Sequence, residues 1–247
     1  MFRADAEKPR EFPGKRSLLP GARVAGAEDE IMRAVETFST SIAEERPPDV
    51  LTHAARRADF DGRPLPEEAV FALERAAAGA AVPIRLVRDP AERALIAGLV
   101  AEGDRILFAD PAYRFELGAR WRAGAPAGDA EVEALLPVPD LFPGLGSFYV
   151  STFDLGELQA KRDFRLAAHA PLLLVVSEGE TTGMRPAVLE ATRQLVIAAE
   201  AAGLAASFFN QPIFVPELRR RLAAGLGLAA PPRAVLGVGT VGAPARA

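Results

Sequence analysis

The sequence contains no cysteine and only two histidines among its 247 residues. Without cysteine the chain forms no disulfide, no thiolate nucleophile and no cysteine-bound metal site, and a reducing cytoplasm is the simpler setting. The two histidines, His53 and His169, would leave a zinc site mostly to carboxylates, and neither lies beside a nucleophile-elbow motif. We therefore expect no metal site and no catalytic side chain, and we interpret both histidines as helix-end or core residues.

Long apolar runs and basic blocks are also missing. The longest apolar runs, such as PLLLVV at 171–176, fall far short of the roughly 20 residues that a membrane span needs. The N-terminal MFRADAEKPREF lacks the apolar centre of a secretory signal. The net charge is −4, and no basic block resembles a nucleic-acid footprint. These absences predict a cytoplasmic protein that binds neither a membrane nor nucleic acid.

The chain has enough apolar residues, 49%, to fill a sizeable core. Residues 1–27 are rich in proline, glycine and charge, which predicts an irregular arm. From Glu28 apolar residues recur at helical spacing, up to the proline pair at 47–48. We therefore predict an arm at 1–27 and a single domain at 28–247.

Within that domain, caps and apolar periodicity predict a mixture of helices and strands. The long stretch at 123–147, dense in alanine, proline and glycine, predicts an excursion of the kind that forms lids or binding elements. The elements do not alternate strictly, so the class is α+β rather than a doubly wound sheet. Helices are expected at 65–80, 89–103, 109–122, 184–202 and 216–227, and strands or extended segments at 82–87, 171–178, 204–212 and 233–242.

The glycine pattern GVGTVG at 237–242 has the spacing of a dinucleotide-binding loop. That loop works because a helix follows it and points its first amides at the pyrophosphate, and only five residues follow here. We interpret these glycines instead as positions where a strand bends or another group approaches closely.

A series of motifs in the second half resembles the nitroreductase superfamily, particularly its Acg-like branch. The series runs PLLLVV, AAGL, SFFNQP, VPELR, LGL and PPRAVLGVG between residues 169 and 239. In the first half, RRADFDGRPLPEE is similar to the family pattern R-R-S-x-R-x-F-x-x-x-P-V-P-x-E, and DPAYRFELGARW is similar to D-P-x-Y-R-x-E-L-x-x-W. The resemblance covers about residues 49–242.

The resemblance implies a fold, a cofactor and a reaction. Such proteins have a nitroreductase-like α+β fold with a central antiparallel or mixed sheet flanked by helices. They form intertwined homodimers that bind FMN at the interface, and pass hydride from NAD(P)H to nitro, quinone or related acceptors. Because the flavin carries the hydride, no protein side chain need act as acid or base.

The resemblance also implies which residues hold the cofactor. Arg56 and Arg57 would contact the FMN phosphate, a task that suits a planar guanidinium; the other interpretation is a pair of solvated charges at a helix end. The stretch SFFNQP would meet the isoalloxazine edge, or would form a strand end with aromatic core packing. The candidate residues there are Ser207, Phe208, Asn210 and Gln211.

Three departures from the family pattern keep a second hypothesis open. Ala58 stands where the motif has serine. The final strand VLGVGTVG carries no charge, whereas many members of the family place lysine or arginine there to help hold the phosphate. The stretch AAAGAAVPIRLV lacks the polar group that FMN-binding members often carry as P-S-x-x-N-x-Q-P-W. The alternative is therefore a non-catalytic relative, either a flavin-storing or flavin-free scaffold or a partner-binding subunit. The sequence leaves open the acceptor and the choice between NADH and NADPH.

Overall fold

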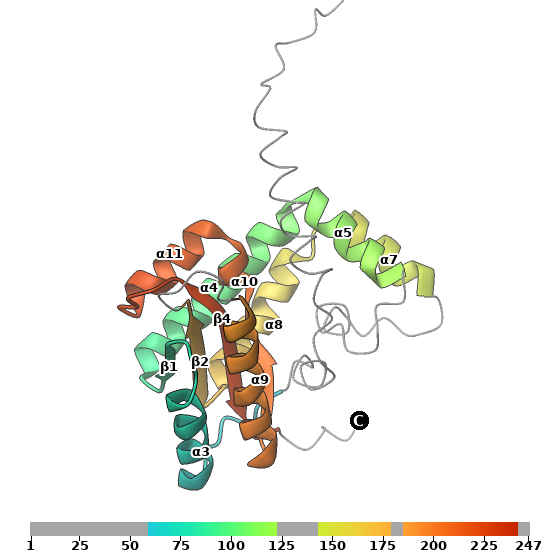
Figure 1. Cartoon of the computed structure of the whole chain (residues 1–247). Coiled ribbons are helices and arrows are strands. Elements are labelled where there is room, and N and C mark those ends of the chain that lie inside the picture. The colour runs from blue at the N-terminus through green and yellow to red at the C-terminus, as the bar shows by residue number, and fades with distance from the viewer. Residues whose placement is uncertain (1–58, 123–142, 179–184, 242–247) are drawn as a thin grey trace, which may run out of the picture. The chain divides into compact units, whose positions relative to one another are not determined.

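The computed structural model describes residues 59–122, 143–178 and 185–241 (Figure 1). These residues all belong to one unit of the chain, Pro47–Ala247. The predicted arm at 1–27, the helix expected from Glu28, and both Arg56 and Arg57 lie outside the described residues. The division into arm and domain therefore stays a prediction.

Four strands form an antiparallel sheet in the order β1-β2-β4-β3 (Figure 1). Every neighbouring pair is antiparallel, and Leu174 in β2 lies opposite Leu86 in β1 and Leu236 in β4. The predicted α+β class with a central antiparallel sheet is confirmed. The strands are β1 (Ile84–Val87), β2 (Leu172–Ser177), β3 (Ala205–Phe208) and β4 (Pro232–Gly239).

Helices cover both faces of this sheet (Figure 1). On one face α3 and α9 pack against alternate residues of β2 such as Leu172 and Leu174. On the other, α4, α8 and α11 pack against Leu173 and Val175. All six residues of β2 are buried, which explains its unbroken apolar run. The bounds are α3 (Glu67–Ala78), α4 (Pro90–Ala109), α8 (Gly156–His169), α9 (Arg185–Ala201) and α11 (Pro216–Gly225).

A pair of helices, α5 (Pro111–Arg122) and α7 (Pro143–Thr152), follows α4 and lies away from the sheet (Figure 1). Their small core includes Leu117 and Val150. The last five residues of the predicted excursion at 123–147 begin α7, and 123–142 lie outside the described residues, so the excursion stays a prediction. No helix was predicted at α8, because its buried positions include the polar Gln159 and Asp163 and the apolar stripe is broken there.

Two glycines near helix ends have different roles. Gly203, predicted to end α9, has φ +71°, the left-handed conformation of a C-cap. Gly103 was predicted to end α4, and this is wrong because the helix continues to Ala109. A Cβ on Gly103 would lie 2.7 Å from the Cβ of Gln211. Gly103 therefore allows close packing of the short helix α10 (Gln211–Phe214) on α4.

Candidate functional site

The segment that begins the described chain lies against the end of β4. Phe60 forms an antiparallel bridge with Val241, and the Asp61 N–H donates to the Thr240 carbonyl at 3.0 Å. Asp61 and Thr240 are 179 positions apart in the sequence. The structure therefore joins the stretch that directly follows Arg56 and Arg57 to the last strand.

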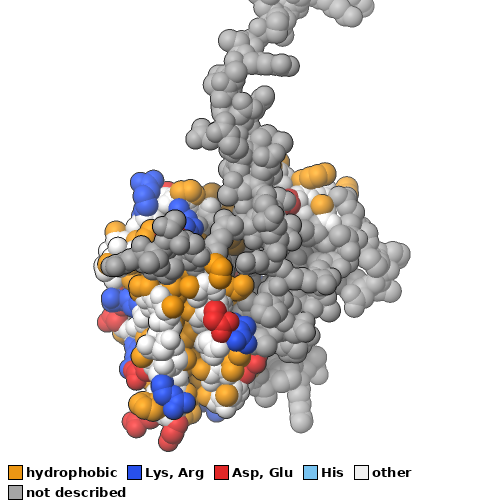
Figure 2. Space-filling view, in the orientation of Figure 1, with side chains coloured by type: hydrophobic (Ala, Val, Ile, Leu, Met, Phe, Trp, Pro, Cys, Tyr) orange, Lys and Arg blue, Asp and Glu red, His pale blue; other side chains and the backbone are white. Residues whose placement is uncertain are grey.

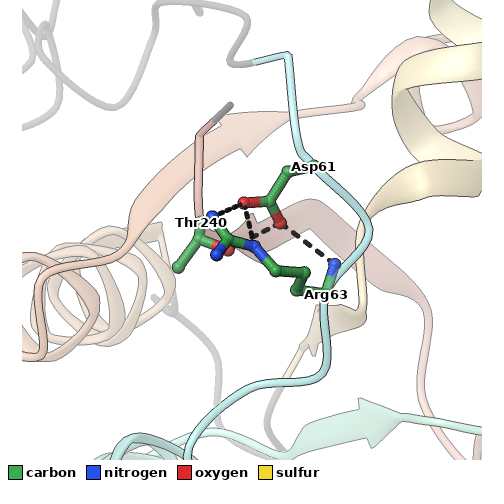
Figure 3. Close-up of polar contacts among 3 residues, drawn as sticks. All are labelled: Asp61, Arg63 and Thr240. Atoms are coloured by element: carbon green, nitrogen blue, oxygen red, sulfur yellow. Dashed lines mark hydrogen bonds and ion pairs between the residues drawn. The ribbon is translucent and has the colours of Figure 1, made fainter. Parts of the chain in front are cut away.

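A compact polar cluster forms at this junction from Asp61, Arg63 and Thr240 (Figure 3). Asp61 Oδ1 accepts from the Thr240 hydroxyl at 2.7 Å and from the Arg63 N–H at 3.0 Å. Its Oδ2 accepts from Arg63 Nε at 2.7 Å and also from Nη2. The Arg63 side chain, then Thr240, lowers the pKa of Asp61 to about 2, so the carboxylate is ionised at neutral pH.

The glycines of GVGTVG make room for aromatic rings on β4. A Cβ on Gly237 would lie 2.6 Å from the Phe209 ring and 3.2 Å from the Phe60 ring. On Gly239 it would lie 2.7 Å from Phe60 and 2.8 Å from the Pro171 ring. The interpretation as close-approach positions is confirmed for Gly237 and Gly239, and Gly242 lies outside the described residues. Phe60 and Phe209 also bring the segment after residue 58 and the end of β3 together over Gly237.

The SFFNQP stretch forms the end of β3 and the turn into α10. Ser207 is fully buried opposite Gly237, and Phe208 is half-buried against the core between the sheet and α3 and α9. Asn210 Oδ1 accepts from the Val235 N–H at 2.9 Å. The buried Gln211 donates from Nε2 to Asp163 Oδ2 at 2.7 Å. Both amide side chains thus bind other parts of the protein.

No family model matches the chain, and no curated protein matches it significantly. Among solved structures, oxidised iodotyrosine deiodinase bound to FMN and 3-iodo-L-tyrosine is similar at 18% identity and a TM-score of 0.47, over 79% of this chain and 90% of that one. A nitroreductase with bound FMN from Bacteroides fragilis is similar at 18% identity and a TM-score of 0.39, over 81% of this chain and 92% of that one. Likeness at this level assigns neither a fold family nor a function, so the assignment of a cofactor site depends on the residues of this chain.

Three described residues each match one part of a flavin mononucleotide, although Phe208 packs on the α3–α9 side of the sheet and Gln211 packs on the side of α4 and α8. A phosphate needs a cation, and the Arg63 side chain, beside Thr240 at the end of β4, is 73% exposed. The polar edge of a flavin ring needs hydrogen-bond partners, and the buried Gln211 Oε1 has no partner among the described residues. A ring face needs apolar cover, and Phe208 is half-buried at the end of β3. Arg56 and Arg57, two of the six residues predicted to bind the cofactor, lie outside the described residues.

Sequence reasoning missed Asp61, Arg63, Thr240 and Asp163. The spacing Asp-Gly-Arg at 61–63 carried a signal, because an aspartate accepting from a backbone N–H two residues on is a common turn. The pairing of Asp61 with Thr240 carried none, since nothing in the sequence links the two positions. Asp163 was missed together with α8.

The paired histidine and acidic residues that a metal site would need are not grouped in the described part of the chain. His169 ends α8, with Nδ1 and the Arg165 carbonyl oxygen 2.8 Å apart, as a helix-end histidine should be. His53 lies outside the described residues. Within the described ranges, no three His, Asp or Glu side chains are grouped so that they could hold a metal ion. No described helix has the length and apolar character to cross a membrane.

A shallow groove of about 660 Å³ lies between α3 and α9. In Figure 2 hydrophobic side chains lie between charged ones on this side of the molecule. Most of the groove is alanine, and its polar Gln194 already donates to Glu190 at 2.6 Å. The groove shares no lining residue with the junction at β4 or with the β3–α10 turn. The alanines are Ala69, Ala72, Ala76, Ala198, Ala201 and Ala202.

Proposed function

We propose that this protein is an FMN-dependent oxidoreductase of the nitroreductase type, acting in the cytoplasm. Its reaction would pass hydride from NAD(P)H through the flavin to a nitro, quinone or related acceptor. The proposal is supported by the sequence resemblance over residues 49–242 and by one structural observation. The Phe60–Val241 bridge joins the stretch after the arginine pair to the last strand, two segments that carry phosphate contacts in the resembled family.

In this proposal the protein binds and orients the cofactor, and FMN when bound supplies the hydride chemistry. Arg56 and Arg57 bind its phosphate. Phe208 covers part of the ring, and the backbone around Ser207 offers hydrogen bonds to the ring edge. Asn210 Oδ1 and Gln211 Nε2 hold this turn in place through Val235 and Asp163, and Gln211 Oε1 is left to accept from the ring edge.

We further propose a homodimer with the cofactor at its interface. Support comes from large apolar side chains with much exposed surface on α5, α7 and α8 and directly after α7. Phe115 is 63% exposed and Phe148 is 58% exposed, and aromatic residues are enriched where protein surfaces meet. Tyr149, Phe153, Leu158 and Phe164 are exposed in the same way.

The visible spectrum of the purified protein tests the proposal. We expect flavin absorption bands, in the protein as isolated or after addition of FMN, that bleach under anaerobic conditions with NADH or NADPH. Comparing the two reductants at equal concentration identifies the preferred one. A colourless protein that FMN does not reconstitute would overturn the proposal.

A second candidate is a flavin-storing or flavin-free scaffold. The observation that favours it is the internal bonding of Asn210 and Gln211, together with a charge-free stretch from Ala234 to Gly239 on β4. Yellow protein that neither nicotinamide reduces indicates storage. If FMN does not raise the melting temperature at concentrations well above those that saturate ordinary flavoproteins, the scaffold or a partner-binding subunit is favoured.

A further inference from the structure

The Arg63 guanidinium is held along one edge and open along the other (Figure 3). Its Nε and Nη2 donate to Asp61 Oδ2. A guanidinium has five N–H groups in a planar fork, so the edge formed by Nη1 and the second N–H of Nη2 remains for another acceptor. The side chain is 73% exposed, whereas that of Asp61 is 13% exposed.

Asp61, which binds the Arg63 guanidinium, is itself held by hydrogen bonds to Thr240 at the end of β4. The Thr240 hydroxyl and the Arg63 N–H both donate to Asp61 Oδ1, and the Asp61 N–H donates to the Thr240 carbonyl. An exposed ion pair alone contributes little to stability. A carboxylate with this many donors instead orients the guanidinium, which lowers the entropy that a ligand must remove when it binds.

We propose that Arg63 is an anion-binding residue of the cofactor site, whose open edge binds the phosphate of FMN through two parallel N–H groups. Bidentate pairing of a guanidinium with a phosphate is among the strongest charge-assisted hydrogen bonds in proteins. This inference rests on the proposed function. Arg63 supplies a positive charge beside Thr240 at the end of β4, where the stretch Ala234–Gly239 of the strand itself has none. Asp61 and Thr240 act through Arg63 as positioning residues.

Comparing FMN with riboflavin tests the inference, because riboflavin has the same ring and ribityl chain but no phosphate. Dissociation constants are measured by flavin fluorescence in phosphate-free buffer for the wild type, Arg63→Ala and Arg88→Ala. Arg88 is the matched control, an exposed arginine paired with Glu74 away from the junction. We expect Arg63→Ala to weaken FMN binding roughly tenfold or more and riboflavin binding less than twofold. Arg88→Ala should change neither.

Two further measurements complete the test. Arg63→Gln keeps a side-chain amide that can donate to Asp61 but has no charge. It should therefore weaken FMN binding and spare riboflavin binding, as expected for Arg63→Ala, and it serves as the test if the alanine variant folds poorly. Inorganic phosphate should compete with FMN but not riboflavin in the wild type, and should lose this effect in Arg63→Gln. Competition by NADPH but not NADH would assign the Arg63 fork to the nucleotide 2′-phosphate instead of FMN and overturn the inference.

The outcomes separate the inference from the proposed function. If the wild type binds neither FMN nor riboflavin, the proposed function fails and the inference fails with it. If it binds both and the ratio of their affinities is the same in wild type, Arg63→Ala and Arg63→Gln, only the inference fails. Equal losses for the two flavins would show that Arg63 supports the fold without contacting phosphate.

Discussion

The buried Gln211 side chain donates from Nε2 to Oδ2 of the buried Asp163 at 2.7 Å, and this hydrogen bond connects the β3–α10 turn to α8. A carboxylate and an amide that are both removed from water must satisfy each other, because an unpaired buried polar group is expensive. The bond thus links a turn that the sequence suggested as a cofactor contact to a helix that the sequence did not reveal.

Replacing Gln211 by leucine should destabilise the protein by about 1–3 kcal/mol, since Asp163 would lose a buried donor while the volume of the side chain is nearly kept. The free energy of unfolding from urea titration measures this loss. Gln194→Leu is the control, because Gln194 donates to Glu190 in an exposed position and its loss should change stability by less than about 0.5 kcal/mol. Equal effects in the two variants would contradict a special role for the buried pair.

Two glycines on α4 should respond in opposite ways to alanine. Gly103→Ala places a methyl group 2.7 Å from Gln211 Cβ and should cost about 1–3 kcal/mol. Gly98→Ala meets no atom within 4 Å on the same helix and should be neutral or stabilise by up to about 1 kcal/mol. Thermal melts of the two variants give the comparison. A stable Gly103→Ala protein would show that α10 does not pack on α4 this closely.

The pKa of Asp61, about 2, predicts how the junction responds to acid. Because this pKa lies below the ordinary 3.8, Asp61 stabilises the folded state fully above the unfolded pKa and loses that contribution as pH falls toward 2. The stability difference between the wild type and Asp61→Asn should therefore shrink as the pH is lowered from about 5 to about 2.

Carboxyl ¹³C titration gives the pKa of Asp61 directly. Thr240→Val removes one donor and should move this pKa up toward 3.8, whereas Thr240→Ser keeps the hydroxyl and should leave it low. An Asp61 pKa that stays near 2 in Thr240→Val would show that Arg63 alone sets it.

The proposed homodimer predicts that the exposed rings of α7 matter for association. Phe148→Asp should lower the dimer fraction by tenfold or more at micromolar concentration, because charged groups are disfavoured at the centre of an interface. Phe71→Asp on α3 is the matched control, with 64% exposure against 58% for Phe148. Light scattering after size exclusion gives the masses. A dimer lost in Phe71→Asp and kept in Phe148→Asp would assign the interface to α3.

Much of the fold can be predicted from local signals in the sequence. The unbroken apolar run of β2 predicts its burial on both faces, and Gly203 marks the end of α9 because the left-handed conformation suits glycine. The Asp-Pro pairs predict helix starts: Asp89 accepts from two N–H groups of α4, and Asp110 accepts from the Ala112 N–H. Such signals depend on a few neighbouring residues and survive without tertiary information.

The parts that could not be predicted depend on contacts between distant residues. Gly103 has the sequence signature of a helix end, and only the approach of Gln211 shows that it serves packing instead. Asp163 is a polar residue at a core position, so its helix lacks a continuous apolar stripe. The antiparallel strand order and the pairing of Asp61 with Thr240 are set by the packed chain as a whole.

The bridge between Phe60 and Val241 also affects the order of folding. Closing so large a loop is favourable only after much of the chain between its ends is ordered, because the entropy of closure is otherwise lost without compensation. The bonds between Asp61 and Thr240 therefore form only when β4 is already in place, whereas the Asp61–Arg63 bonds join residues two positions apart and need no other strand. Any phosphate compound that prefers the assembled junction favours, by mass action, the chains in which the last strand has docked.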